Sequence, residues 1–144
     1  MGQALHYTID LPAPRARVWS LMLDDASYRD WTSAFCPGSY YEGEWRTGAD
    51  IRFLSPDGGG MRARIEAAEF PAYVSIAHLG ELRAGQPVDA SNWANVFERY
   101  RLSELPGDAT HLEVELTDVP EAYVEMMNQM WPKALERLKA MAAA

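Results

Sequence analysis

Basic residues are scarce in this sequence of 144 residues, in which 13 lysines and arginines stand against 21 aspartates and glutamates, for a net charge of −8. Proteins that bind nucleic acid neutralise phosphates with clustered lysine and arginine side chains. The few cations of this chain are scattered, and no basic cluster is found. The sequence therefore argues against nucleic acid as a partner, and the negative charge mainly favours solubility.

Long apolar runs and cysteines are almost absent as well. No stretch approaches the roughly 20 apolar residues that a membrane-spanning helix needs, so we expect no membrane association. The first ten residues lack the basic and apolar segments of a secretory signal. The single cysteine, Cys36, cannot form an intrachain disulfide, and we interpret it as a structural thiol. These features lead us to expect a cytoplasmic protein.

Recognisable metal and phosphate motifs are missing too. The three histidines, His6, His78 and His111, lie far apart in the sequence, and no cysteine or histidine pair has the spacing of metal ligands. The glycine-rich segment 55–60 lacks the lysine and the following helix of a phosphate-binding loop, so it is interpreted as a turn. The sequence thus predicts neither a metal nor any other cofactor.

Alternation of apolar and polar residues predicts most of the secondary structure. It indicates seven strands, at Gln3–Leu11, Ser39–Trp45, Ala49–Leu54, Met61–Phe70, Tyr73–Leu82, Trp93–Ser103 and Thr110–Thr117. Two short helices are predicted between the first two strands, at Arg15–Leu23 and Ala26–Trp31. The segment 83–91 has the composition of a loop.

The segment Pro120–Met141 has the pattern of a long amphipathic helix. Apolar residues recur with the three- and four-residue spacing of one helical face, at Tyr123, Met127, Met130, Trp131, Ala134, Leu135, Leu138 and Met141. Asp118 is expected to cap the start of the helix. Pro132 lies inside the helix and removes a backbone hydrogen bond, so a kink is expected near residues 128–131.

These elements predict an α+β fold. Strands joined by short hairpins form an antiparallel sheet with one apolar face, and the C-terminal helix is available to cover that face. Because the two short helices separate the first strand from the second, the first strand can pair with the last and let the sheet curl. A curled sheet with a kinked helix across it favours a cavity over a solid core. We expect a single domain that spans residues 1–144.

The order of elements and four local motifs resemble the START-like helix-grip superfamily, also called SRPBCC. The motifs are APRARVW at residues 13–19, YRDW at 28–31, EGEWRTG at 42–48, and Trp131 through Leu138. The chain looks most like the branch named for the activator of the heat-shock-protein ATPase. The resemblance implies a helix-grip fold with a pocket between the sheet and the long helix. The superfamily includes lipid and hormone carriers, polyketide cyclases and aromatases, stress-response proteins and chaperone co-factors.

Few side chains are candidates for chemistry in such a pocket. His78 shares a strand face with Val74 and Ile76, so it is either a core histidine with a hydrogen-bond partner or a polar group that orients a ligand or moves a proton. Glu98 and Tyr100 share a face of the next strand and could join it, and a buried glutamate is rare unless paired. A β-bulge near residues 95–97 would reverse that assignment.

The remaining candidates are apolar and aromatic. Methionine adapts to ligands of varying shape, although a stripe of methionine and aromatic residues is also typical of a core. The complete set of predicted ligand-binding residues is Trp31, Phe35, Phe53, Met61, Ile65, Ile76, His78, Glu98, Tyr100, Met127, Met130 and Trp131. Trp45 and Trp93 are expected to pack the sheet, and His6 and His111 are expected to be solvated.

Three functions remain open from the sequence. The first is binding of a small apolar or aromatic molecule between the sheet and the long helix. The second is an enzyme of the cyclase, aromatase or hydrolase kind, with His78 as general acid or base. The third, which the resemblance implies, is a co-factor of a chaperone ATPase. A homodimer formed through an exposed strand edge is compatible with all three.

Overall fold

The computed structural model describes residues 2–88 and 96–144. The elements in chain order are β1 (Gly2–Leu11), α1 (Arg15–Leu23), α2 (Asp25–Trp31), the short 3₁₀ helix η1 (Thr32–Ala34), β2 (Tyr40–Gly43), β3 (Asp50–Leu54), β4 (Gly60–Glu69), β5 (Tyr73–Arg83), β6 (Gln86–Pro87), β7 (Phe97–Leu105), β8 (Ala109–Pro120) and α3 (Glu121–Ala143). The predicted α+β helix-grip fold is confirmed. The expected order of strands and helices holds apart from one added strand.

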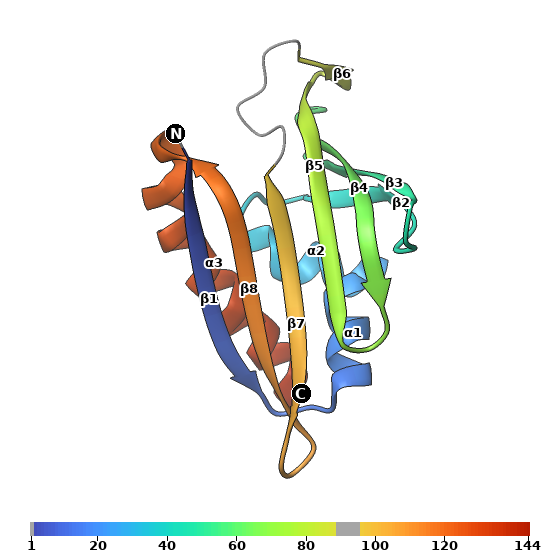
Figure 1. Cartoon of the computed structure of the whole chain (residues 1–144), viewed down its shortest axis with the longest axis vertical. Helices are drawn as coiled ribbons and strands as arrows, with labels where there is room; N and C mark the ends of the chain where they lie inside the picture. Colours follow the sequence, from blue (N-terminus) through green and yellow to red (C-terminus); the bar gives the residue numbers. More distant parts are fainter. Residues whose placement is uncertain (1, 89–95) are drawn as a thin grey trace.

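One curved antiparallel sheet carries the fold, with its strands in the order β1-β8-β7-β5-β4-β3-β2. The predicted pairing of the first strand with the last long strand is confirmed, since Thr8 lies opposite Glu113 and Ile9 opposite Leu112. Helix α3 lies behind β1 and β8, and helices α1 and α2 lie on the same side of the sheet (Figure 1). These three helices therefore cover one face of the sheet, and the other face is left uncovered by them.

The strand predictions needed three corrections. The described residues form eight strands, because Gln86–Pro87 pairs with β5 inside the segment that was predicted to be a loop. Strand β2 ends at Gly43, whose φ of 134° belongs to the region that favours glycine, so the predicted extension to Trp45 is wrong. Strand β7 begins at Phe97, and residues 93–95 of the predicted strand lie outside the described residues.

The phase of β7 agrees with the prediction. Tyr100 and Leu102 are buried, and the pairing with β5 runs without a shift from Phe97 to Arg101. The described part of the strand therefore has no bulge that would turn Glu98 outward, although residue 95 of the expected bulge region lies outside the described residues.

Helix α3 begins one residue later than predicted and without the expected cap. Pro120 occupies the capping position and no described side chain caps the helix, while Asp118 belongs to β8 and has a φ of 54°. The strand therefore leads directly into the helix. The helix continues through Pro132 to Ala143, so the proline does not end it, and the bend near residues 128–131 stays a prediction.

The core lies between α3 and the covered face of the sheet. The core includes Leu112 and Val114 of β8 and Leu138 of α3, all of which are fully buried. The alternation of β8 predicts burial of the first two, and the helical spacing of α3 predicts burial of the third. The indole Nε1 of Trp31 donates a buried hydrogen bond of 3.1 Å to the carbonyl oxygen of Met22. This bond ties the end of α2 to α1 beneath the surface, so the two short helices pack as one unit against the sheet.

An ion pair joins α2 to α3 at the surface. The guanidinium of Arg137 donates two hydrogen bonds to the carboxylate of Asp30, at 2.6 and 2.8 Å. These hydrogen bonds lower the pKa of Asp30 below its ordinary value of 3.8. A carboxyl group whose pKa is lowered by folding contributes stability above its unfolded pKa and loses that contribution as the pH falls through the folded pKa.

We therefore expect Asp30→Asn to lower the stability at pH 7 by a small amount, because the pair is exposed. The difference from the wild type should disappear as the pH falls below 3.8 through the lowered pKa of Asp30, because the wild-type carboxyl is then itself protonated. Urea denaturation at pH 7 and at a series of acidic pH values measures this. The matched control is Asp30→Asn in an Arg137→Gln background, where it should have no effect. An equal loss in both backgrounds would show that the pair contributes nothing.

Candidate functional site

A cavity of about 420 Å³ lies between the sheet, the segment from α2 to η1, and the first half of α3. Its volume falls in the range of roughly 300–1,000 Å³ that is typical of small-molecule sites. Met126 at its rim is 38% exposed, so the cavity reaches the surface of the molecule. A single water takes about 30 Å³ of liquid volume, so the space is much larger than a packing defect that holds a few waters.

Aromatic rings form one wall of this cavity. Trp131 of α3 lies at the centre, with the ring of Phe35 edge-on at 4.9 Å and the rings of Trp31 and Tyr100 at 6.2 and 6.1 Å. On the opposite side, the rings of Tyr28 and Phe53 are stacked at 6.2 Å. Rings at these distances attract one another through their edges and faces. The wall is therefore ordered by its own contacts and also offers flat apolar surface to a ligand.

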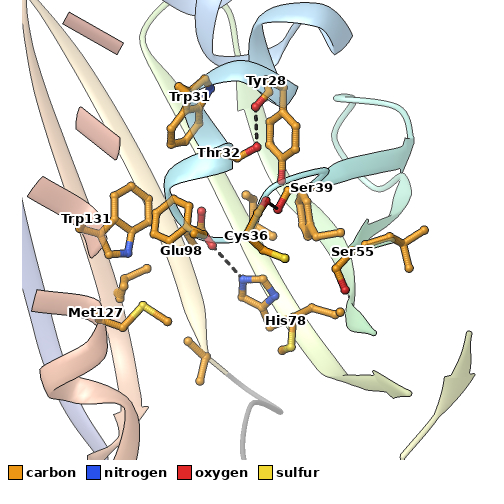
Figure 2. A pocket seen from close by; sticks show the side chains of 18 of the residues that line it. Tyr28, Trp31, Thr32, Cys36, Ser39, Ser55, His78, Glu98, Met127 and Trp131 are labelled. Atoms are coloured by element: carbon orange, nitrogen blue, oxygen red, sulfur yellow. Dashed lines mark hydrogen bonds and ion pairs between the residues drawn. The ribbon is translucent and has the colours of Figure 1, made fainter. Parts of the chain in front are cut away.

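A polar chain of three side chains lies on the floor of the cavity. Nε2 of His78 lies 3.0 Å from Oε1 of Glu98, and the hydroxyl of Tyr100 donates a hydrogen bond to Oε2 of the same carboxylate. The side chains of His78 and Glu98 are 6% and 20% exposed. Figure 2 shows the bond between His78 and Glu98 inside the pocket, with Trp131 and Cys36 around it. The other ring nitrogen of His78, Nδ1, is buried and has no hydrogen-bond partner among the described residues.

The antiparallel pairing of β5 and β7 produces this arrangement. Glu98 lies directly opposite Ile76, so His78 is its diagonal neighbour on the same face of the sheet. Tyr100 follows Glu98 at a spacing of two residues, which places both side chains on that face. The three polar groups therefore come together through strand register alone.

The electrostatics of the site keep its phenols neutral. Burial raises the pKa of Tyr100 well above its ordinary value of 10.0, and the charge of Glu98 and its hydrogen bond raise it further. Burial also raises the pKa of Tyr28, with a second contribution from the charge of Glu98. At physiological pH both hydroxyl groups keep their hydrogen, so Tyr100 acts as a donor toward Glu98.

Ten of the twelve predicted residues line the cavity: Trp31, Phe35, Phe53, Met61, Ile76, His78, Glu98, Tyr100, Met127 and Trp131. Ile65 and Met130 do not. Ile65 is fully buried in the core beside a register shift in β4, so its side chain is enclosed by protein. Met130 is half-buried and does not line the cavity, although it follows Met126 and Met127 at the spacing of one helical face.

Several lining residues were not predicted. They are Met22, Leu23, Tyr28, Thr32, Cys36, Ser39, Trp45, Leu54, Ser55, Gly60, Glu81, Leu82, Val96, Leu116, Tyr123 and Met126. Trp45 was expected to pack the sheet; it contacts Tyr41 of β2 and Phe53 of β3, and it also contributes to the cavity. Trp93 lies outside the described residues. Tyr123 could have been found, since it shares the helical face of Met127, whereas nothing in the pattern points to the irregular segment around Cys36 and Ser39.

The other two histidines lie on the uncovered face of the sheet. His6 has a side chain that is 58% exposed, and its Nε2 lies 3.6 Å from Glu113. His111 is less solvated than expected, because its side chain is 33% exposed and its Nδ1 lies 2.6 Å from a carboxylate oxygen of Asp10. Within residues 2–88 and 96–144 no three histidine, cysteine, aspartate or glutamate side chains are placed to hold a metal ion.

Among the described residues, no helix combines the length and the apolar character that crossing a membrane requires.

Comparisons with known proteins identify relatives of this fold. A family model described as "Activator of Hsp90 ATPase homolog 1-like protein" matches residues 12–143. No curated protein matches the sequence significantly.

Three solved structures illustrate the likeness. Protein MLL2253 from Mesorhizobium loti has a TM-score of 0.75 at 13% identity, over 96% of this chain and 95% of its own. The Aha1 dimer from Colwellia psychrerythraea has a TM-score of 0.75 at 16% identity, over 95% and 93%. CalU16 from Micromonospora echinospora has a TM-score of 0.69 at 23% identity, over 97% and 74%. The TM-scores of these three structures show that they share the fold of this chain.

The aromatic wall leads to a prediction about stability. Trp131 is only 4% exposed, so Trp131→Ala should destabilise the protein by about 3–5 kcal/mol, as truncation of a core aromatic residue does. Urea denaturation followed by circular dichroism measures the loss. Trp19→Ala is the control, because Trp19 is half-buried and packs against the exposed Phe70 away from the cavity. A loss for Trp131→Ala no larger than that of the control would mean that Trp131 borders empty space and contributes little to the core.

Proposed function

The chain belongs to the Activator of Hsp90 ATPase homolog 1-like family, and we propose that it binds a small, largely hydrophobic molecule in the cavity between the sheet and helix α3. The observation that carries this proposal is the cavity of about 420 Å³ with its aromatic wall and its polar chain. Apolar walls supply affinity in such sites, and a few placed polar groups fix the orientation of the ligand.

The rim of the cavity supports the same proposal. Met126 and Met127 of α3 and Met61 of β4 lie around it. Methionine side chains are unbranched and polarizable, so they adapt to ligands of irregular shape. Tyr123 lies one turn before Met127 on the same helix, so the first two turns of α3 present an adjustable cover over the cavity.

A specific observation favours a second candidate function, acid–base catalysis. His78 lines the cavity and lies 3.0 Å from the carboxylate of Glu98, so it has both access to a ligand and an orienting partner. A base oriented by a carboxylate is the arrangement that proton transfer needs. A His78 whose ring nitrogens were both bonded to the backbone would have counted against this candidate. Neither ring nitrogen is bonded to the backbone of the described residues.

Two further expectations stay predictions. A homodimer is compatible with the open edges at β1 and β2, and one relative is itself described as a dimer. Stimulation of a chaperone ATPase is suggested by the family description alone. The described contacts of the cavity do not bear on either.

We expect ligand binding to be detectable without knowing the ligand. Native mass spectrometry of the freshly purified protein should reveal a co-purified small molecule, or thermal denaturation against aromatic, polyketide-like and lipid compounds should show a specific rise in melting temperature. Met127→Trp should reduce that rise, because the larger ring occupies part of the cavity. Gln129→Trp is the matched control, since Gln129 is exposed on the same helix and does not line the cavity. A clean mass together with no shift from any class of compound would reject the proposal.

The catalytic candidate makes a separate prediction. The wild type should convert the compound identified in this screen to a product of different mass or retention time, and Glu98→Gln should bind the compound but convert it more slowly, by about 10²-fold or more. Chromatography with mass detection follows the reaction. Unchanged compound after long incubation with the wild type would leave binding as the function.

A further inference from the structure

We propose that the ligand of this cavity carries a neutral hydroxyl group, of a phenol or an alcohol, that donates a hydrogen bond to Nδ1 of His78. The inference rests on the ligand-binding function proposed above and specifies the chemistry of the ligand.

The first step concerns the hydrogen between His78 and Glu98. Oε2 of Glu98 accepts a hydrogen bond from Tyr100, and Oε1 lies 3.0 Å from Nε2 of His78. A carboxylate only accepts hydrogen bonds, so Nε2 must carry the hydrogen that joins the two side chains. Glu98 thereby fixes which ring nitrogen of His78 is protonated and which is left for other partners.

The second step concerns Nδ1. This atom is buried and has no partner among the described residues, in a side chain that is 6% exposed. A hydrogen on Nδ1 would make His78 a buried cation with an unpaired donor, which costs more than an unpaired lone pair. Nδ1 is therefore an acceptor in the free protein, and a complementary ligand must offer it a donor.

The charge of the cavity selects among donors. Its described lining contains Glu81 and Glu98 and neither lysine nor arginine. A carboxylate or phosphate on the ligand would thus meet only like charge. An ammonium group would lose its hydration in an apolar cavity, and both oxygens of Glu98 already accept bonds from His78 and Tyr100. A neutral hydroxyl group is the donor that avoids both costs.

The surroundings of His78 favour an aromatic carrier for this hydroxyl group. The ring of Phe53 lies 5.9 Å from the ring of His78, and Nδ1 is on the side of the imidazole that faces away from Glu98 (Figure 2). A flat aromatic molecule can lie against the walls of the cavity while its hydroxyl group reaches the imidazole. A phenol of two fused rings is therefore a suitable probe.

The test compares four naphthalene derivatives that share one ring system. They are 2-naphthol, its methyl ether 2-methoxynaphthalene, 2-naphthoate, and 2-naphthylmethylammonium, each titrated into the wild type by calorimetry. We expect 2-naphthol to bind about tenfold tighter than the methyl ether, which keeps the shape and loses the donor. His78→Phe should remove the difference. His6→Phe is the matched control and should keep it, because His6 lies on the uncovered face of the sheet.

A second readout does not depend on any variant. In histidine labelled with nitrogen-15, long-range proton–nitrogen spectra of the free wild type should show Nε2 of His78 protonated and Nδ1 unprotonated. Addition of 2-naphthol should shift the Nδ1 resonance.

Several results would overturn the inference. Equal affinity for 2-naphthol and its methyl ether would overturn the inference and leave the ligand-binding function intact. Tighter binding of 2-naphthoate or of 2-naphthylmethylammonium than of 2-naphthol would have the same meaning. A hydrogen on Nδ1 in the free protein would also overturn it. If none of the four naphthalene derivatives binds but a compound from the thermal-denaturation screen does, that compound replaces 2-naphthol in the comparison. If the compound that binds has no hydroxyl group, the inference is contradicted. If nothing binds, the ligand-binding function itself fails.

Discussion

The position of helix α3 depends on the packing of Trp131. Its ring stacks on Tyr7 of β1 at 5.8 Å and also contacts Tyr100 of β7, Trp31 of α2 and Phe35 after η1. One side chain therefore joins the helix to the edge of the sheet, to its middle, to α2 and to the segment after η1. Because interiors are close-packed, these contacts restrict where the helix can lie and how far its two ends stand from the sheet.

The two halves of α3 consequently differ. After Trp131 the helix is closely packed, since Ala134, Leu138 and Ala142 are buried against the rest of the core. Before Trp131 its inner face is formed by Tyr123 and Met127, which line the cavity and stay only half-buried. The C-terminal half supplies stability through burial of apolar surface. The N-terminal half is thereby left to cover the cavity with side chains that can rearrange.

Much of this architecture could be predicted from periodicity, because a strand shows alternate faces and a helix shows one stripe. Alternation places His78 and Glu98 on the inner face of the sheet, and helical spacing places Trp131 on the inner face of the helix. Periodicity could not separate Met61 from Ile65, which share one face of β4 but differ in what encloses them. It also missed Cys36 and Ser39, since the position of short irregular segments is set by tertiary packing and leaves no periodic signal. Tyr28 could have been found, because it lies three residues before Trp31 on helix α2. Strand β6, with two residues, is too short to carry a period.

The polar chain on the cavity floor is hard to explain by stability alone. The side chain of Glu98 is 20% exposed, so its carboxylate loses much of its hydration, and well-packed apolar residues in place of a buried ion pair are often neutral or stabilising. Glu98 is compensated by two donors, Tyr100 and His78, so its charge is tolerated at this site. The hydrogen bonding of the polar chain is incomplete, because Nδ1 of His78 is buried without a partner among the described residues. A molecule in the cavity that offers a donor to this nitrogen would complete its hydrogen bonding, and this links the polar chain to the cavity beside it.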